Sequence, residues 1–170
     1  IKKIWDKVAG DHKELVLILN GGNEEAIALC KDSNIPLISA TGSTQMGKEL
    51  APLVSARLGR TLLELGGNNA AIICPTADLD LTIKGVTFSA AGTTGQRCTT
   101  LRRAFVHEDI YEEFMKKLHA YYATLKVGDP SDTASQLGPL ISEKSFNDMQ
   151  NVLTSLKEKN VKIHGGQRLE

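Results

Sequence analysis

The sequence predicts an α/β protein in which parallel strands alternate with helices. Short apolar runs alternate with amphipathic stretches along the 170 residues, and glycine-rich turns separate them. The first apolar runs are continuous, which is typical of strands covered on both faces. A hydrophobic content of 41% and a mean hydropathy of −0.16 are ordinary for a globular chain that buries one core or parts of two.

The first part of the chain contains three predicted strands, over residues 15–20, 36–40 and 61–65. A short helix over residues 24–31 separates the first two strands. A longer amphipathic helix separates the second from the third, with Ser43 or Thr44 as its N-cap and Gly59 at its end. Its apolar positions fall on one helical face and are Met46, Leu50, Leu53, Val54 and Leu58.

The second part continues the alternation with predicted strands over residues 70–74, 102–107 and 161–164. Helices are predicted over residues 79–91, 108–126 and 146–156, and a polar loop over residues 130–140. Between the first helix and the second strand lies a segment rich in Gly and Thr that ends at Cys98. This composition predicts that Cys98 lies on a loop.

Charge and cysteine content exclude several classes of partner. Twenty basic and twenty acidic residues give a net charge of zero, so the basic excess that nucleic-acid binding needs is missing. No apolar run approaches the roughly 20 residues that span a bilayer. Three cysteines without metal-type spacing predict reduced thiols, a cytoplasmic location and no bound metal. Cys30 and Cys74 are interpreted as small hydrophobic residues of a core.

The turn Thr41-Gly42-Ser43-Thr44 is a candidate anion site, because a helix N-terminus after a strand offers unpaired amides. A good N-cap explains the same residues without a ligand. Gly42 to Lys48 also has the spacing of a nucleotide-hydrolase phosphate loop, which makes that enzyme class an alternative. Glu49, however, stands where a Ser or Thr should coordinate magnesium, and a carboxylate there repels phosphates.

Glu64 is a candidate general base. It lies between leucines at the end of a predicted buried strand, and Gly66-Gly67 follow. A partly desolvated carboxylate can act as a base near neutral pH, and the glycines allow close approach of a ligand. The alternative is a strand end whose carboxylate points into water, with the glycines forming a tight bend.

Cys98 is a candidate nucleophile. Its neighbours are polar, the predicted loop gives access, and Arg97 offers positive charge that stabilises a thiolate. A thiolate is the group that attack on a carbonyl requires. A cysteine protease is a weaker alternative, because His107 is the only histidine near in sequence and it lies at a predicted strand end.

Taken together, these segments resemble the aldehyde dehydrogenase family. The chain carries Glu64-Leu65-Gly66-Gly67 and, 34 residues after Glu64, the Cys98 of a Gly-Gln-Arg-Cys element. It also carries Thr-Gly-Ser upstream and, downstream, Val127-Gly128-Asp129-Pro130 followed by Gly138-Pro139. The resemblance covers nearly the whole chain. Ala40 departs from the phenylalanine that is common before Thr-Gly-Ser in the family.

Within the family, Leu-Leu-Glu-Leu-Gly-Gly-Asn-Asn and Gly-Gln-Arg-Cys-Thr-Thr look most like the antiquitin branch. Members of that branch oxidise α-aminoadipic semialdehyde or its cyclic form. The resemblance implies that Arg97, with Thr99 nearby, meets the substrate and that the Arg97 guanidinium pairs with its carboxylate. The alternative is that Arg97 only tunes the thiol or pairs with an acidic residue.

The resemblance also implies a mechanism that uses NAD, with NADP as the alternative. Cys98 attacks the aldehyde, its backbone amide helps to hold the oxyanion, and Glu64 later activates the water that hydrolyses the thioester. Gly42 and Ser43 face the cofactor phosphates, and Gly66 lets the nicotinamide half pass close to the chain. The implied cofactor-binding residues are Thr41, Gly42, Ser43, Met46, Leu65 and Gly66.

The expected architecture is aldehyde dehydrogenase-like, with part of a Rossmann-type parallel sheet followed by part of a second α/β catalytic domain. Residues 1–65 are expected to belong to the NAD-binding domain and residues 66–170 to the thiol-bearing domain. The chain lacks an initiator Met and several family site residues, so we expect a fragment that is inactive alone and comes from a homo-oligomeric parent. A catalytically silent scaffold is the alternative of a different class.

Overall fold

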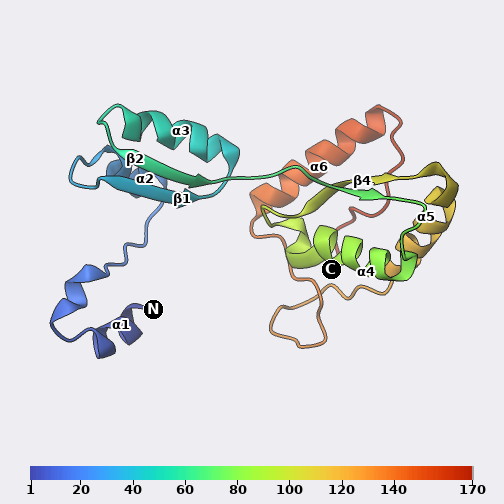
Figure 1. Cartoon of the computed structure of the whole chain (residues 1–170), viewed down its shortest axis with the longest axis horizontal. Coiled ribbons are helices and arrows are strands. Elements are labelled where there is room, and N and C mark those ends of the chain that lie inside the picture. Colours follow the sequence, from blue (N-terminus) through green and yellow to red (C-terminus); the bar gives the residue numbers. More distant parts are fainter. Residues whose placement is uncertain (170) are drawn as a thin grey trace. The chain divides into compact units, whose positions relative to one another are not determined.

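The computed structural model describes residues 1–169 and divides the chain into two compact units, Ile1–Leu65 and Gly66–Glu170 (Figure 1). Both units are α/β with parallel strands, so the predicted fold class is confirmed. None of the helices within the described residues has the length and apolar character that a bilayer span requires.

The first unit contains a two-stranded parallel sheet with helices beside it (Figure 1). Strands β1 and β2 pair in register from Leu37 opposite Arg60 to Thr41 opposite Glu64. Two helices supply the buried residues, with Cys30 on α2 and Leu50 and Val54 on α3 packed together. The elements in order are α1 (Lys2–Val8), a 3₁₀ turn (Gly10–Leu15), α2 (Asn23–Lys31), β1 (Leu37–Thr41), α3 (Thr44–Ser55) and β2 (Arg60–Glu64).

Helix α3 forms for the predicted reasons but ends earlier than predicted. Ser43 is the N-cap, and its hydroxyl oxygen accepts a hydrogen bond from the Met46 amide at 3.0 Å. The helix ends at Ser55. Leu58 then adopts a positive φ of 59°, and its side chain is 94% exposed, so its assignment to the apolar helix face was wrong. The chain must reverse there to enter β2, and the Gly59 amide donates to Val54 O at 3.0 Å to close this turn.

The predicted strand over residues 15–20 was wrong. Residues 10–15 form the 3₁₀ turn, and the residues that follow pair with neither β1 nor β2. Leu17, Ile18 and Leu19 are exposed. An apolar run signals a segment suited to burial, but a strand also needs a neighbour for its backbone hydrogen bonds, and this segment has none in the described chain.

The second unit also has a parallel strand pair with helices packed against it. In order, its elements are β3 (Asn69–Ile73), α4 (Leu79–Ala91), a 3₁₀ turn (Gly92–Gly95), β4 (Leu101–Val106), α5 (Glu108–Tyr122) and α6 (Glu143–Glu158). The register between β3 and β4 skips one residue, because Asn69 faces Leu101 whereas Ala70 faces Arg103. Arg102 is therefore the extra residue of a β-bulge.

The core of the second unit lies between this strand pair and helices α4 and α5. Its buried residues are Ile73 of β3, Ile83 and Val86 of α4, and Phe114 of α5. Phe114 is 1% exposed and is the largest fully buried side chain. This core fixes β3 against α4 and α5, and β4 begins three residues after Cys98. It therefore positions the segment that carries the predicted nucleophile.

Three details of the second unit differ from prediction. Helix α5 ends at Tyr122 instead of residue 126, because the amides of Thr124 and Leu125 turn back to the carbonyls of Tyr121 and Tyr122. Residues 161–164 form no strand, and no strand of the described chain pairs with them. Cys74 directly follows β3 and is exposed, so its placement in a core was wrong.

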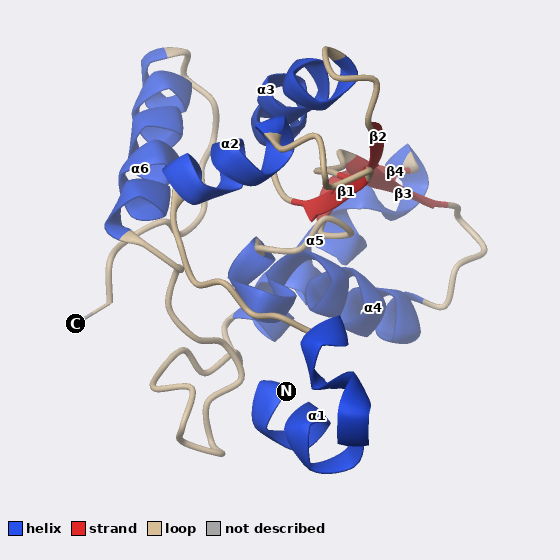
Figure 2. Cartoon of the chain, turned by 90° about the vertical axis from the view of Figure 1, so that its left-hand side faces the viewer, coloured by secondary structure: helices blue, strands red, loops and turns tan. Residues whose placement is uncertain are grey.

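The segment between α5 and α6 is drawn as loop in Figure 2, as predicted for residues 130–140. Its regular pairing within the described residues is one isolated bridge between Val127 and Leu137. The side chains of Ser131 and Asp129 and the amide of Ser131 form a local turn, because both donor groups of Ser131 bond to Asp129 Oδ1. These bonds lower the pKa of the Asp129 carboxyl below its usual range.

Candidate active site

The first unit gathers its predicted site residues at the carboxyl ends of β1 and β2. Thr41 and Glu64, the last residues of the two strands, face each other in register, and the Gly42 amide donates to Glu64 O at 3.0 Å. Because parallel strands end at the same edge of a sheet, the Gly42-Ser43 turn and Glu64 are neighbours. The side chain of Glu64 is exposed.

The turn from β1 into α3 fits an anion such as a cofactor phosphate. Helix α3 has 12 residues; the Met46 amide donates to Ser43, and the amides of the exposed residues Thr44 and Gln45 have no partner within the helix. The Met46 side chain lies against Gly42, since a Cβ on Gly42 would stand 2.6 Å from Met46 Sδ. Glycine at this position therefore lets methionine close one side of the turn.

Gly47, which the phosphate-loop alternative would place against a ligand, packs within the first unit instead. Gly47 is buried against Leu65, because a Cβ on Gly47 would lie 2.6 Å from Leu65 Cδ1. Because Gly47 has no side chain, α3 can pack closely against the end of β2 at this position. Glu49 is an acceptor for the Gln45 side chain at 2.8 Å. Leu65 is half-buried by the same contact, and Gly66 begins the second unit.

Cys98 lies on a loop, as predicted, and its side chain is exposed. The loop is hydrogen-bonded to the start of β3, where Asn69 Nδ2 donates to Cys98 O at 2.8 Å and to Thr100 O at 3.1 Å. Within the loop, the Arg97 amide donates to Thr100 Oγ1 at 3.0 Å, and the Thr100 amide donates to Arg97 O at 3.2 Å. Thr100 is 3% exposed. The nucleophile candidate thus combines an accessible thiol with an anchored main chain.

Gln96 ties the same loop to the segment between α5 and α6. Its side-chain oxygen, Oε1, accepts a hydrogen bond from the Ile141 amide at 2.8 Å. Its side-chain nitrogen, Nε2, donates to Thr93 O at 3.1 Å and to Pro139 O at 3.4 Å. The Thr94 hydroxyl donates to Gly138 O at 2.7 Å. Hydrogen bonds therefore join the Gly-Gln and Gly-Pro elements, which lie about 40 residues apart in sequence.

The turn before Cys98 contains two residues in the left-handed backbone region. Thr93 and Thr94 have φ values of 54° and 55°, and Gly95 follows with 71°. A β-branched residue rarely adopts this conformation, and surrounding contacts must hold it there. The side chains of Thr93 and Thr94 both make hydrogen bonds, to Arg97 and to Gly138 respectively. Backbone strain of this kind is concentrated at functional sites in proteins.

Arg97 is half-buried and packs along the end of α4. Its Nε donates to Thr93 Oγ1 at 2.8 Å, and its guanidinium carbon lies 5.1 Å from the centre of the Phe88 ring. Among the described residues, no Asp or Glu forms an ion pair with Arg97. The alternative in which Arg97 pairs with an acidic residue therefore finds no such residue within positions 1–169. Thr99 is exposed beside Cys98.

The predicted base and the predicted nucleophile belong to different units. Glu64 is placed by β2 of the first unit, and Cys98 is placed by β3 and β4 of the second. The structure brings Glu64 together with Thr41, Gly42 and Ser43, and it brings Cys98 together with Asn69, Arg97 and Thr100. The residues that sequence reasoning missed are Asn69, Thr100 and Gln96, since nothing in the sequence indicated which distant groups they bind.

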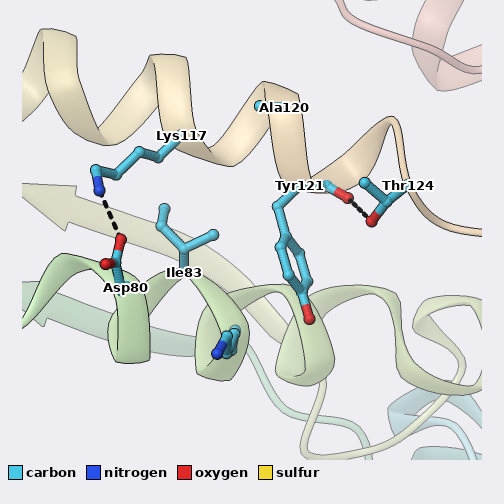
Figure 3. A pocket seen from close by; sticks show the side chains of 7 residues that line it. Asp80, Ile83, Lys117, Ala120, Tyr121 and Thr124 are labelled. Atoms are coloured by element: carbon cyan, nitrogen blue, oxygen red, sulfur yellow. Dashed lines mark hydrogen bonds and ion pairs between the residues drawn. The ribbon is translucent and has the colours of Figure 1, made fainter.

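A groove between α4 and α5, about 410 Å³ in volume, contains none of the predicted site residues (Figure 3). Lys117 Nζ lies 2.5 Å from Asp80 Oδ1 at one end of it, and Tyr121 lies farther along. The hydrogen bond from Lys117 lowers the pKa of the Asp80 carboxyl and raises that of Lys117.

Within residues 1–169, no three His, Cys, Asp or Glu side chains form a group suited to a metal ion.

Gly67 leaves no space for a side chain beside the Cys98 loop. A Cβ there would stand 2.8 Å from Cys98 O, a backbone atom that cannot rotate away. We expect Gly67→Ala to displace the loop and to lower the free energy of unfolding by about 1–3 kcal/mol, measured by urea denaturation. The matched control is Gly85→Ala in α4, where no atom lies within 4 Å. That change should stabilise by about 0.5–1 kcal/mol through helix propensity, and equal effects of both variants would contradict the expectation.

Comparison with known proteins identifies the family. The aldehyde dehydrogenase family matches residues 1–170. The chain is 40% identical to the alpha-aminoadipic semialdehyde dehydrogenase of Bos taurus over 174 residues, which cover 100% of the chain and 32% of that protein. It is 41% identical to aldehyde dehydrogenase family 7 member A1 of Pisum sativum, over 89% of the chain and 30% of that protein.

Solved structures agree in fold. A putative aldehyde dehydrogenase from Anabaena variabilis, PutA, superposes with a TM-score of 0.91 at 29% identity, over 99% of this chain and 36% of that one. A Staphylococcus aureus betaine aldehyde dehydrogenase in complex with NAD+ gives a TM-score of 0.86 at 28% identity, over 91% of this chain and 31% of that one.

The chain spans about one third of the length of these relatives. The resemblance predicted from the Glu-Leu-Gly-Gly and Gly-Gln-Arg-Cys elements is confirmed, including the branch that contains the alpha-aminoadipic semialdehyde dehydrogenases. On the match over its full length and on these identities, the chain belongs to the aldehyde dehydrogenase family.

Proposed function

We propose that this chain supplies the nucleophile, the base and part of the cofactor site of an enzyme that oxidises an aldehyde to a carboxylic acid with NAD or NADP. The observation that carries the proposal is the Cys98 loop, where an exposed thiol lies on a main chain tethered by Asn69 and Gln96. A structural cysteine needs neither exposure nor a fixed loop, whereas a nucleophile needs both.

In the proposed mechanism, the Cys98 thiolate attacks the carbonyl carbon and forms a carbon–sulfur bond. The backbone amide of Cys98 donates a hydrogen bond to the oxygen, which gains the electron pair of the carbonyl. When bound, a nicotinamide cofactor would accept the hydride from the substrate carbon, and the carbonyl would re-form as a thioester on Cys98. The Glu64 carboxylate then takes a proton from water, whose oxygen attacks the thioester carbon; the carbon–sulfur bond breaks to release the acid and the Cys98 thiolate, and Glu64 passes its proton to solvent.

The two units divide this work in the proposal. Residues 1–65 form part of the cofactor-binding domain, and residues 66–170 form part of the thiol-bearing domain. The turn at the start of α3 supports the first assignment, because its exposed amides suit a phosphate. The residues proposed to meet the cofactor are Thr41, Gly42, Ser43, Met46, Leu65 and Gly66.

For the substrate, we propose a semialdehyde such as α-aminoadipic semialdehyde. The name of the Bos taurus relative supports this choice. Arg97 and Thr99, which flank Cys98, are the proposed contacts, and the Arg97 guanidinium has no acidic partner among the described residues. Its bond to Thr93 and its contact with Phe88 hold it in place. A fixed guanidinium is suited to pairing with a carboxylate.

We further propose a cytoplasmic setting and a homo-oligomeric full-length enzyme. The three cysteines are unpaired, which supports a reducing compartment. Because the chain spans about one third of its relatives, we expect little or no dehydrogenase activity from these 170 residues alone.

The proposal predicts that Cys98 is more reactive than the other exposed thiol of the chain. Cys74 and Cys98 are both exposed, and Cys30 is buried, so accessibility does not separate the first two. A nucleophile must react with electrophiles faster than a thiol without a role, so we expect iodoacetamide at pH 7 to label Cys98 at least about fivefold faster than Cys74. Peptide mass spectrometry on the intact chain measures both rates in one sample.

Denaturation in urea is the control, because unfolding removes the local environment and should bring the two rates close together. Equal labelling of Cys98 and Cys74 in the folded chain would favour the silent scaffold over the enzyme.

A further inference from the structure

Both peptide groups that flank the Cα of Cys98 are hydrogen-bonded. The peptide before it is held through Arg97 O, which accepts from the Thr100 amide at 3.2 Å. The peptide after it is held through Cys98 O, which accepts from Asn69 Nδ2 at 2.8 Å. With both peptide planes fixed, the direction of the Cys98 Cα–Cβ bond and of its amide is fixed as well.

The bond from Asn69 lies at an irregularity of the sheet. Asn69 faces Leu101 and the next residue faces Arg103, so the strand that leaves the Cys98 loop carries a bulge. Bulges are features that re-aim side chains next to functional sites. Here the bulge coincides with the residue whose side chain reaches back to Cys98, 29 positions later in the sequence.

The chemistry of the contact requires an amide donor. Both acceptors, Cys98 O and Thr100 O, are carbonyl oxygens, and the two N–H groups of one Asn69 amide serve them. An aspartate has the same shape but carries no proton to donate at neutral pH. Gly67 closes the other side, because a Cβ there would meet both Cys98 O and the Asn69 amide nitrogen, at 2.8 and 3.1 Å.

We propose that Asn69 is a positioning residue for the nucleophile: it fixes the main chain of Cys98 and thereby the direction of the Cα–Cβ bond that carries the thiol and of the Cys98 amide. This inference rests on the proposed function of Cys98. Asn69 acts through the loop and takes no part in the bond-making steps.

The test compares Asn69→Asp with the matched control Asn68→Asp in the full 170-residue chain. Both changes add one negative charge at neighbouring positions, and Asn68 offers its backbone carbonyl, not its side chain, to Arg103. In Asn69→Asp we expect amide hydrogen exchange at Arg97 and Thr100 to accelerate at least about tenfold, because their closed turn loses its anchor. Exchange in β3 and α4 should stay unchanged.

Cysteine labelling gives a second measurement with an internal reference. Cys74 lies at the other end of β3, so general loosening of the unit raises its rate too, whereas loss of the Asn69 contact changes Cys98 alone. We expect the ratio of Cys98 to Cys74 labelling by iodoacetamide to change at least about threefold in Asn69→Asp and to stay constant in Asn68→Asp. Asn68→Asp adds the same charge one position away and therefore controls for the effect of an added carboxylate on labelling.

Asn69→Gln retains a side-chain amide donor and should restore part of the protection against hydrogen exchange at Arg97 and Thr100. If the carboxylate of Asn69→Asp prevents folding, Asn69→Ala removes the donor without adding a charge. The positioning role is overturned if Asn69 variants match Asn68→Asp, or if β3 exchange and Cys74 labelling rise in parallel with the loop. Failure of the proposed function is a different result, in which Cys98 and Cys74 of the unaltered chain react equally. The exchange experiment still decides the role of Asn69 in that case.

Discussion

Replacing Cys98 with serine is expected to lower kcat for aldehyde oxidation by on the order of 10³-fold or more, because a hydroxyl is not ionised at neutral pH and attacks a carbonyl poorly. The measurement needs a complete fold, and a hybrid enzyme provides one when this chain replaces the corresponding third of the Bos taurus relative. Initial rates of cofactor reduction with α-aminoadipic semialdehyde give kcat.

Cys74→Ser is the matched control in the same hybrid, since Cys74 is exposed and has no proposed role. It should keep the parent rate. Quenching of protein fluorescence by NAD, retained in Cys98→Ser, would show that the lost activity is not lost folding. A Cys98→Ser hybrid that turns over at the parent rate would remove the nucleophile from the proposal.

Replacing Glu64 with glutamine is expected to lower the steady-state rate by roughly 10²- to 10⁴-fold through loss of a general base. The first turnover should survive, because thioester formation does not need Glu64 in the proposed mechanism. Stopped-flow absorbance should therefore record a burst of reduced cofactor close to one equivalent per active site, followed by very slow turnover.

Glu49→Gln is the control for a lost carboxylate in the same unit, since Glu49 is an exposed residue of α3 that accepts from Gln45. It should leave both phases unchanged. Loss of the burst together with the steady state in Glu64→Gln would mean that Glu64 acts before the thioester forms, and an unchanged steady state would mean that it is not the base.

Local patterns in the sequence predicted most of the elements. Apolar spacing and a capping serine predicted α3, and Ser43 caps it. The predicted helix over residues 79–91 has the observed bounds, Leu79–Ala91. Helices are predicted well because their hydrogen bonds and caps join residues three or four positions apart, so the relevant information is contiguous.

The same patterns failed where an element depends on a distant neighbour. The apolar run at residues 15–20 has the composition of a strand, but the described chain offers it no partner. Cys74 has the apolar surroundings of a core residue, yet it lies just beyond the end of β3 and is exposed. Pairing and burial are decided by segments far away in sequence, which periodicity does not report.

For the site, the sequence by itself determined the residue types and their order: the Glu-Leu-Gly-Gly element, the loop with Cys98 and the capped turn after β1. Only the tertiary structure decided that Asn69 holds Cys98 O, that Gln96 binds the segment around Ile141, and that Arg97 packs on Phe88. The physical reason is that reactive groups, such as a thiol or a carboxylate, belong to single residues and can be read directly from the sequence. Orientation depends instead on hydrogen bonds between groups 29 and 45 positions apart, which form only when the chain folds.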